Sequence, residues 1–177
     1  MLEIKEKKLN SNITFSIFET IISDEKMNQD IIKVIDKQGN KQNYSTNVKA
    51  QMTEWNMINE PGFDNLSKTI SDLSIYASKK KYNVKIKPVV HNIWGIKYKS
   101  EEIALPHDHW PALWSCVYYI NPPKNAPGLL FTEANVERQL ENGLLIMFEG
   151  HIKHEVRKIK YTDYRYVVSA NVYNDFR

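Results

Sequence analysis

The second half of the chain, from Asn83 onward, is a series of short β-branched and aromatic runs separated by turn signals. Stretches such as LWSCVYYI, LLIMFEG and RYVVSANVY have the length and composition of strands. Clusters rich in proline, asparagine and glycine, including NPPKNAPG and ENG, divide these stretches. About seven short strands in succession are typical of a β-sandwich or jelly roll.

The first half has a different pattern, which predicts two amphipathic helices. Residues 13–19 have the pattern of a strand, after which Ser23 is expected to cap a helix that Gly39 ends. The polar residues 43–55 are expected to be extended, and residues 66–82 are expected to form the second helix. The apolar stripes of the two helices consist of Met27, Ile31, Ile32 and Ile35, and of Leu66, Ile70, Leu73, Ile75 and Tyr76.

The order of these elements predicts an α+β fold, with a jelly-roll core and N-terminal helices packed on one side. The chain has 177 residues and no linker, repeat or low-complexity stretch, so we expect a single domain, residues 1–177. Within this domain, residues 1–82 form the helix-containing N-terminal part. Residues 83–177 form the jelly-roll core, which is expected to carry the functional site.

Charge and composition argue against several classes of function. The net charge is +3 and the lysines are scattered, so no nucleic-acid partner is expected. The N-terminus is charged and lacks the apolar core of a signal peptide, and no apolar stretch approaches the ~20 residues of a membrane span. We therefore expect a cytoplasmic protein without a membrane partner. Cys116, the one cysteine, lies in an apolar run and is expected to be a buried hydrophobic residue.

The histidines are concentrated in two short segments of the predicted β region. His107 and His109 flank Asp108, and His154 follows the strong strand LLIMF. In an extended chain His107 and His109 point to the same face and Asp108 points to the other. Three imidazole nitrogens suit iron, zinc, copper or nickel, and their chemistry does not choose among these metals. The alternative is that these are ordinary surface or core histidines.

Arg165 begins the last strong strand, eleven residues after His154. An arginine on an inner strand near a metal can bind a carboxylate through its planar guanidinium. The alternative is an ion pair at the surface with Asp163 or Glu155. The spacing alone does not decide between these two roles.

The order of these residues resembles the iron(II)- and 2-oxoglutarate-dependent oxygenases of marine bacteria and phages, in their prolyl-hydroxylase-like branch. The shared pattern is H-x-H, S-x-V-Y-Y-I-x-P, G-L-L, F, H-E-V and R-x-x-x-S-x-N, and it covers about residues 85–173. The matching residues are His107, His109, Ser115, Val117, Tyr118, Tyr119, Pro122, Gly143, Phe148, His154, Glu155, Val156, Arg165, Ser169 and Asn171.

The resemblance implies a double-stranded β-helix that holds Fe(2+) and 2-oxoglutarate at its mouth and consumes dioxygen. His107 and His154 are then metal ligands, and Arg165 binds the distal carboxylate of 2-oxoglutarate. Further contacts to this acid are expected from Ser169, Asn171, Tyr98 and Tyr118. The implied reaction is C–H hydroxylation of a small molecule or of a protein side chain such as proline. If the chain is phage-encoded, it works in the host cytoplasm.

Two positions depart from the family pattern. The family's triad is His-x-Asp/Glu…His, whereas this chain has His109 at the carboxylate position and Asp108 beside it. The strand alternation favours His109 as the third ligand, with Asp108 as the alternative. At position 167 the family often has serine, and this chain has valine. One hydrogen bond to 2-oxoglutarate is therefore expected to be absent.

The surroundings of the site and the competing functions complete these expectations. Trp110 and Trp114 flank the first histidine segment, as pocket walls or, for Trp114 especially, as core residues. The polar residues 132–142 are expected to form a lid that faces the substrate. The competing functions are a cupin-like dioxygenase with three histidines and no co-substrate, and a jelly-roll module that binds a ligand without catalysis.

Overall fold

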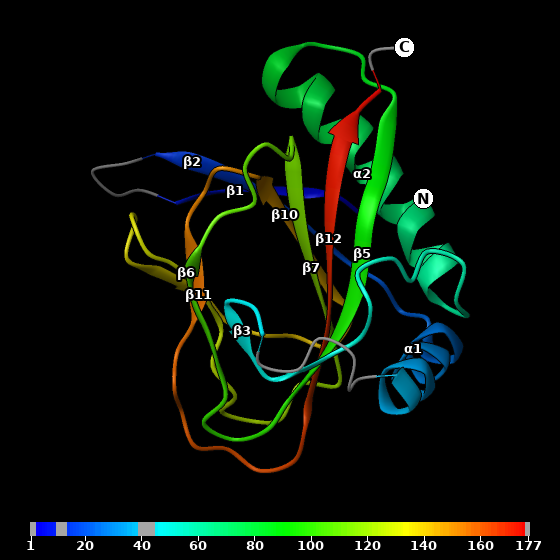
Figure 1. Cartoon of the computed structure of the whole chain (residues 1–177). Coiled ribbons are helices and arrows are strands. Elements are labelled where there is room, and N and C mark those ends of the chain that lie inside the picture. The colour runs from blue at the N-terminus through cyan, green and yellow to red at the C-terminus, as the bar shows by residue number, and fades with distance from the viewer. Residues whose placement is uncertain (1–2, 10–13, 39–44, 176–177) are drawn as a thin grey trace.

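The computed structural model describes residues 3–9, 14–38 and 45–175 as two facing antiparallel β-sheets with two helices (Figure 1). Both helices lie on the outer face of the larger sheet, and the smaller sheet covers its inner face. The mixture of helices and a β-rich core agrees with the α+β class that the sequence predicts. No helix among the described residues has the length and apolar character needed to cross a membrane.

The larger sheet holds seven strands in the order β1-β2-β10-β7-β12-β5-β4. Its central members are the long apolar runs of the second half, but β1, β2 and β4 come from the first half of the chain. The N-terminal part therefore supplies strands as well as helices. The strands are β1 (Lys5–Leu9), β2 (Phe15–Ile21), β4 (Gln51–Met52), β5 (Pro88–Tyr98), β7 (Trp114–Ile120), β10 (Leu144–Glu149) and β12 (Arg165–Asn174).

The smaller sheet holds five strands in the order β3-β6-β11-β8-β9. Within it β6 pairs with β11, and this pairing brings together the two histidine segments of the sequence. The sequence pattern did not indicate β3 or β9 as separate strands. The strands are β3 (Val48–Lys49), β6 (Ile103–His107), β8 (Leu129–Phe131), β9 (Val136–Arg138) and β11 (His154–Val156).

The first helix, α1 (Glu25–Gln38), follows the predicted apolar stripe but begins at a different cap. The carboxylate of Asp24 accepts a hydrogen bond from the backbone N–H of Met27 at 2.9 Å. This contact is the geometry of an N-cap side chain, so Asp24 and not Ser23 caps the helix. The predicted stop at Gly39 lies outside the described residues.

The second helix, α2 (Phe63–Tyr82), begins three residues earlier than its apolar stripe predicts. Asn83 ends it in the left-handed conformation, with φ of 56°, and donates its backbone N–H to the carbonyl of Lys79. Ile75 and Tyr76 were expected in the buried stripe, but they are 44% and 39% exposed. The buried face of α2 is formed instead by Phe63, Leu66, Ser67, Ile70, Leu73, Ser74, Ala77 and Ser78.

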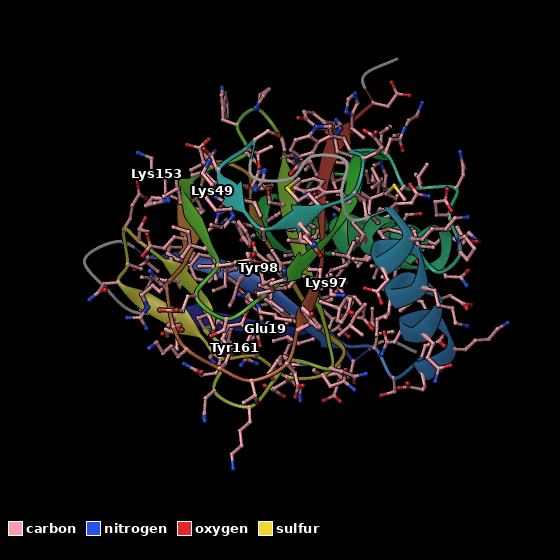
Figure 2. All side chains as sticks on the ribbon, turned by 60° about the horizontal axis from the view of Figure 1, so that its bottom comes forward. Glu19, Lys49, Lys97, Tyr98, Lys153 and Tyr161 are labelled. Atoms are coloured by element: carbon pink, nitrogen blue, oxygen red, sulfur yellow. The ribbon has the colours of Figure 1, made fainter. Side chains whose placement is uncertain are left out.

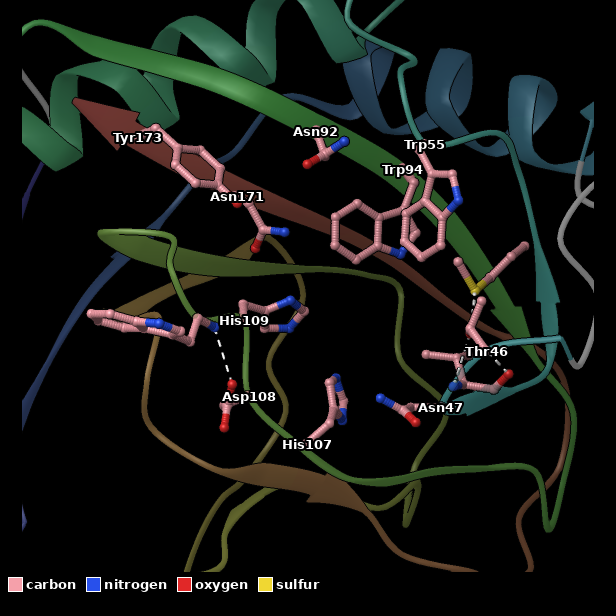
Figure 3. A pocket seen from close by; sticks show the side chains of 13 residues that line it. Thr46, Asn47, Trp55, Asn92, Trp94, His107, Asp108, His109, Asn171 and Tyr173 are labelled. Atoms are coloured by element: carbon pink, nitrogen blue, oxygen red, sulfur yellow. Dashed lines mark hydrogen bonds between the residues drawn. The ribbon is translucent and has the colours of Figure 1, made fainter. Parts of the chain in front are cut away.

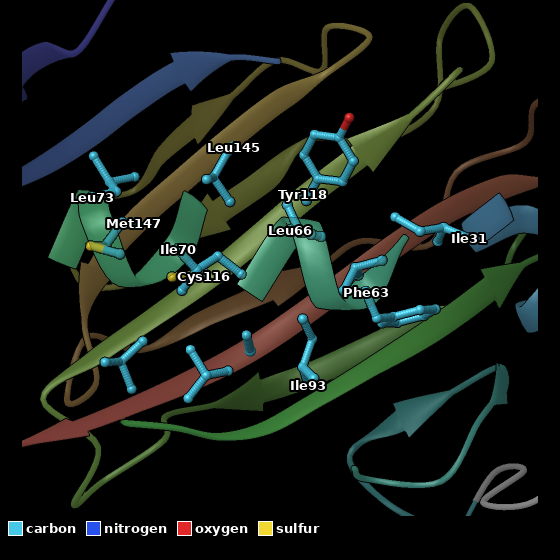
Figure 4. Close-up of a cluster of buried hydrophobic side chains, with 14 of the residues drawn as sticks. Ile31, Phe63, Leu66, Ile70, Leu73, Ile93, Cys116, Tyr118, Leu145 and Met147 are labelled. Carbon is cyan, nitrogen blue, oxygen red and sulfur yellow. The ribbon is translucent and has the colours of Figure 1, made fainter. Parts of the chain in front are cut away.

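Two hydrophobic cores lie on opposite faces of the larger sheet. Alternate residues of β7 explain how both are built. Cys116 and Tyr118 point to the helices (Figure 4), and Val117 and Tyr119 belong to the core between the sheets. Because both faces are covered, this strand is apolar throughout, which hides its alternation in the sequence. Trp114 belongs to the helix-side core and donates its indole N–H to Ser78 Oγ at 2.8 Å.

Close packing of α1 on the sheet depends on Gly95 in β5. A Cβ built at Gly95 would lie 2.3 Å from Cγ1 of Ile35 in α1, so no larger residue fits without moving the helix. On the opposite face of β5, Trp94, Ile96 and Tyr98 point between the two sheets. The position of Tyr98 in the interior is visible in Figure 2. The inter-sheet space on this side of β5 contains the candidate site.

Candidate metal centre

The structure brings His107, His109 and His154 together at one end of the inter-sheet space. One ring nitrogen from each residue lies within 4.8 Å of those of the other two. His107 ends β6 and His154 begins β11, and these two residues are paired directly across the strands. His109 lies beyond the end of β6, in a turn that its backbone N–H fixes by a 2.7 Å hydrogen bond to Gly150 O.

Asp108 does not join this cluster. Its carboxylate turns back and accepts a hydrogen bond from the backbone N–H of Trp110 at 3.0 Å, whereas His107 and His109 point into the cavity (Figure 3). Alternation along an extended strand predicts the same arrangement from the sequence. In the structure the strand ends at His107, so the orientation of His109 is set by the turn and not by alternation.

Backbone contacts fix two of the three rings. His107 Nδ1 lies 2.6 Å from Leu105 O, and His154 Nδ1 lies 3.0 Å from Ile152 O. A carbonyl oxygen can only accept, so each Nδ1 carries the proton and each Nε2 keeps its lone pair. This orientation, in which a backbone carbonyl holds the far side of the ring, is typical of metal-binding histidines.

Burial keeps all three imidazoles neutral at physiological pH. It lowers the pKa of His107 and, together with the neighbouring His107 ring, lowers the pKa of His109 to about 4. Burial also lowers the pKa of His154 well below its ordinary value, and the other two rings lower it further. Neutral imidazole is the form that binds a metal ion, so no proton has to be removed first.

Arg165 is fully buried at the other end of the same inter-sheet space. Its guanidinium carbon lies 4.9 Å from the ring centroid of Tyr98 and 5.4 Å from that of Tyr119. Among the described residues, its Nε and Nη1 atoms have no hydrogen-bond partner. The alternative, a surface ion pair with Asp163 or Glu155, is not found among the ion pairs of the described residues. A buried charge without a partner is costly, so this site favours an anion.

The structure corrects the position of Tyr118. Its side chain points to the helices, where its hydroxyl donates to Asn28 Oδ1 of α1 at 2.6 Å, so it does not reach the site (Figure 4). The next residue, Tyr119, lies on the site face beside Arg165, and its buried hydroxyl has no partner among the described residues. Burial raises the pKa of Tyr119, which therefore remains a hydrogen-bond donor.

The other residues predicted to contact 2-oxoglutarate lie in two different places, an inner chamber and the mouth of the site. Tyr98 and Ser169 line a narrow chamber, about 30 Å³ in volume, between the histidines and Arg165. Val167 lines the same chamber and offers no hydrogen bond there. Asn171 lies further out, where its Oδ1 accepts a 3.2 Å hydrogen bond from Ser115 Oγ. The inward side chains of β12 therefore run from the buried Arg165 to the mouth.

An outer cavity of about 440 Å³ opens at the mouth, on the solvent side of His107 and His109 (Figure 3). Its walls are mainly aromatic rings and amide side chains, and among the described residues that line it there is no lysine or arginine. The indole N–H of Trp94 is buried here and has no partner among the described residues. The lining consists of Thr46, Asn47, Val48, Met52, Trp55, Asn92, Trp94, His107, Asp108, His109, Trp110, Asn171 and Tyr173.

The expected lid, residues 132–142, does not line this cavity. This segment includes β9 at the far edge of the smaller sheet, where Arg138 Nε donates to Glu19 Oε1 of β2 at 2.7 Å. The wall facing the histidines comes instead from residues 46–55, which the sequence marks only as polar and extended. Of the two flanking tryptophans, Trp110 lines the cavity and Trp114 is a core residue.

The donor set fits iron(II) and a dicarboxylic keto acid. Three convergent neutral imidazoles suit a first-row transition metal and leave its remaining positions to other ligands. The unpartnered donors of Arg165, which lines the chamber at the end opposite the histidines, suit a carboxylate there, and Tyr119 lies beside this guanidinium. The chamber is narrow, so an acid that reaches Arg165 has to move the side chains that line it apart.

No protein-family model and no curated protein matches this sequence. Solved structures do resemble the fold. A Pseudomonas putida prolyl-4-hydroxylase matches with a TM-score of 0.66 and 13% identity, over 90% of this chain and 92% of the other. The prolyl hydroxylase of Trichoplax adhaerens, in complex with a hypoxia inducible factor peptide fragment, gives 0.64 and 16%, over 88% and 83%.

The third similar structure is the viral collagen prolyl hydroxylase of Paramecium Bursaria Chlorella virus-1, in its 2-oxoglutarate complex. Its TM-score is 0.60 at 13% identity, over 88% of this chain and 94% of the other. Identities this low are informative about the fold alone. The chain therefore shares its fold with these three prolyl hydroxylases.

Proposed function

We propose that this chain is an iron(II)- and 2-oxoglutarate-dependent dioxygenase that hydroxylates a C–H bond. The main support for this proposal is that three convergent imidazoles and the buried guanidinium of Arg165, which has no ion-pair partner among the described residues, line the same inter-sheet space. We interpret the two sheets as a double-stranded β-helix and the chain as one domain, residues 1–177. We also propose that it is a His-x-His variant of the prolyl-hydroxylase-like branch, found in marine bacteria and phages and working in the cytoplasm.

In this proposal His107, His109 and His154 hold the iron through one nitrogen each. Bound iron(II) and 2-oxoglutarate together supply the oxidative chemistry, in which dioxygen converts the keto acid to succinate and carbon dioxide while a substrate C–H bond gains a hydroxyl. Arg165 orients the acid by a two-point contact to its distal carboxylate. Burial of Arg165 between Tyr98 and Tyr119 excludes water and strengthens this contact.

Tyr119, and not Tyr118 as the sequence predicts, is proposed to contact 2-oxoglutarate. Its hydroxyl is buried beside Arg165 and can donate to the same carboxylate. Ser169 lines the chamber and is proposed as a further donor along the acid, since Val167 offers none. Asn171 lines the outer cavity and is proposed to contact the end of the acid nearest the metal, or the substrate.

The three-histidine set gives this centre a distinct charge. Without a carboxylate ligand, the ion keeps its full double positive charge on the protein side, so an anionic co-substrate is bound more strongly. The same set favours the alternative of a cupin-like dioxygenase, which needs no co-substrate. The unpaired Arg165 favours the 2-oxoglutarate enzyme, because its guanidinium lines the chamber opposite the histidines, where it suits the distal carboxylate of a dicarboxylic acid.

The proposed substrate is an uncharged group on a protein side chain, such as proline. The outer cavity has aromatic and amide walls, and its described lining residues include no lysine or arginine to bind the carboxylate of a free acid. The similar Trichoplax adhaerens structure holds a peptide of hypoxia inducible factor, and the viral one is a collagen prolyl hydroxylase. These likenesses in fold favour a polypeptide over a small metabolite.

The proposal is tested by incubating the purified protein with iron(II), ascorbate and 2-oxoglutarate and measuring succinate. We expect slow succinate release without substrate, no bound metal in His154→Ala, and weakened 2-oxoglutarate binding in Arg165→Met. If the wild-type protein retains no divalent metal after anaerobic reconstitution, or binds iron(II) without affinity for 2-oxoglutarate, the proposal is wrong.

A further inference from the structure

A second concave space lies beside the outer cavity, on the other side of Trp110. It has a volume of about 640 Å³, larger than that of the outer cavity. Its walls are Tyr82 at the end of α2, residues 84–86 just after this helix, and residues 110–113, which follow the histidine turn. Glu149 and His151, at the end of β10, and Tyr173 and Asn174, at the end of β12, complete it. We call this space the docking groove.

The docking groove and the outer cavity are adjoining spaces. Trp110 and Tyr173 line both of them. Trp110 is 74% exposed, which is unusual for a tryptophan and is typical of a residue that binds a partner. Each space alone has the volume of a small-molecule pocket, so a ligand that fills both is elongated.

Residues 110–113 separate the two spaces, and we call them the ridge. Backbone hydrogen bonds hold this ridge in place. The backbone N–H of Leu113 donates to Val172 O at 2.9 Å, and the N–H of Gly150 donates to Leu113 O at 3.2 Å. A Cβ built at Gly150 would lie 2.1 Å from Ala112 O, so this close approach requires glycine. Trp110 is therefore presented from a fixed turn, which lowers the entropy cost of binding.

The opposite wall offers backbone groups to a ligand. Residues 83–87 belong to no helix or strand. Among the described residues, the backbone N–H and C=O groups of Lys85 and Ile86 have no backbone partner. Polypeptides bind such open backbone groups through their own amides, with apolar side chains in the adjoining pocket. A small apolar metabolite cannot use these groups in this way.

The charges of the groove suit an apolar segment. Glu149 would oppose one, but its carboxylate is ion-paired to Lys81 at 2.5 Å and accepts a hydrogen bond from the hydroxyl of Tyr82. Tyr82 and Val84 leave apolar surface exposed on the same wall, at 42% and 44%. Apart from tyrosines, Lys85 and His151 are the remaining ionisable residues among the described residues of the lining.

We propose that the docking groove binds an apolar, extended stretch of a polypeptide, next to the residue that enters the outer cavity. This inference rests on the proposed function, because it states where the flanking residues of a hydroxylated side chain bind. The polypeptide crosses the ridge at Trp110 and Tyr173. Its backbone hydrogen-bonds to Lys85 and Ile86, and its side chains contact Val84 and Leu113.

The test uses the full-length protein loaded with iron(II) and 2-oxoglutarate under anaerobic conditions. Phage-displayed random peptides of about ten residues, which span about 33 Å when extended, are selected on it. The affinity of each selected peptide is then measured by fluorescence anisotropy. We expect peptides with apolar side chains to be selected and to bind Val84→Glu about tenfold or more weakly than the wild type.

Val89 provides a matched control. It is 40% exposed, close to the 44% of Val84, and does not line the groove. Val89→Glu adds the same charge to the same region of the surface, and we expect it to change peptide affinity by less than about twofold. Both variants are checked for metal content and thermal unfolding, which the proposal expects to match the wild type.

Three outcomes overturn the proposal. The first is that no peptide is selected. The second is that the selected peptides bind Val84→Glu as tightly as the wild type. The third is that Val84→Glu abolishes self-association of the protein but leaves its affinity for peptides unchanged. The last outcome identifies a second copy of the chain as the occupant. Loss of peptide affinity in Val84→Glu but not in Val89→Glu supports the proposal.

Failure of this inference is distinguishable from failure of the proposed function. Succinate release without peptide tests the enzyme and needs no docking groove. Peptide binding to the metal-free protein tests the groove and needs no reaction. A protein that releases succinate but selects no peptide contradicts the groove alone. A protein that binds peptide at Val84 but has no affinity for 2-oxoglutarate contradicts the enzyme alone.

Discussion

His107 and His154 face each other directly across the antiparallel pair β6 and β11, with ring centroids 4.5 Å apart. One strand pairing thus joins two segments that are distant in the sequence. The rigidity of a paired sheet holds these two rings at a fixed separation, and the turn after β6 adds His109. The consequences of this arrangement can be measured.

The choice of third ligand gives the first prediction. His109→Ala is expected to weaken metal binding by more than about a hundredfold, because one of three converging nitrogens is lost. Asp108→Asn is expected to retain the metal, since its side chain still accepts from the N–H of Trp110. Metal content after anaerobic dialysis measures both. Retention in His109→Ala together with loss in Asp108→Asn would identify Asp108 as the ligand.

Arg165→Met separates stability from function. The guanidinium is buried with two unpaired nitrogens, so replacing it by an apolar side chain is expected to stabilise the metal-free protein by about 1–4 kcal/mol. The same variant is expected to bind 2-oxoglutarate about a hundredfold more weakly. Urea unfolding and anaerobic titration measure the two effects. A large loss of stability would show that Arg165 has a structural partner and would weaken its assignment to the acid.

The adjacent tyrosines provide a matched pair. Tyr118→Phe removes a buried hydrogen bond to Asn28 and is expected to cost about 1–2 kcal/mol of stability, with 2-oxoglutarate affinity unchanged. Tyr119→Phe removes a hydroxyl without a protein partner and is expected to leave stability unchanged but to weaken 2-oxoglutarate binding about tenfold. The reverse result would return the binding role to Tyr118.

The metal-free protein should lose stability in mild acid. The pKa of His109 is lowered from 6.5 to about 4 by burial and by His107. Between these values the unfolded chain binds a proton that the folded protein does not, so stability falls as the pH falls through this window. His109→Gln should show a smaller fall in stability between pH 7, which lies above this window, and pH 5, which lies inside it, when both are measured by urea unfolding. Equal slopes would contradict the lowered pKa.

Much of the fold could be predicted from the sequence because its strands are long, apolar and separated by clear turn signals. The strands β5, β7, β10 and β12 and the helices α1 and α2 all lie where the pattern indicates. The short strands β3 and β9 could not be predicted, since two or three residues carry no period. β1 is a lysine-rich edge strand, KEKKL, without an apolar face to detect.

The site was predictable in its residue types but not in its finer geometry. Alternation suggested that His107 and His109 point together, although a turn beyond the strand orients His109. The face of Tyr118 could not be read, because β7 is buried on both sides and apolar throughout. The pairing of β12 with β7 decides the face. Val167 lies opposite Tyr119, and Arg165 is two residues from Val167 on the same strand, so Tyr119 and not Tyr118 shares a face with Arg165. Only the assembled sheets revealed the wall formed by residues 46–55.

The most direct test of the central claim is an anaerobic titration of the iron(II)-loaded protein with 2-oxoglutarate, followed by visible absorption. The account predicts a charge-transfer band that saturates at one equivalent of acid per iron, and an about hundredfold weaker titration in Arg165→Met. Absence of the band in wild-type protein that carries a full complement of iron would contradict the account.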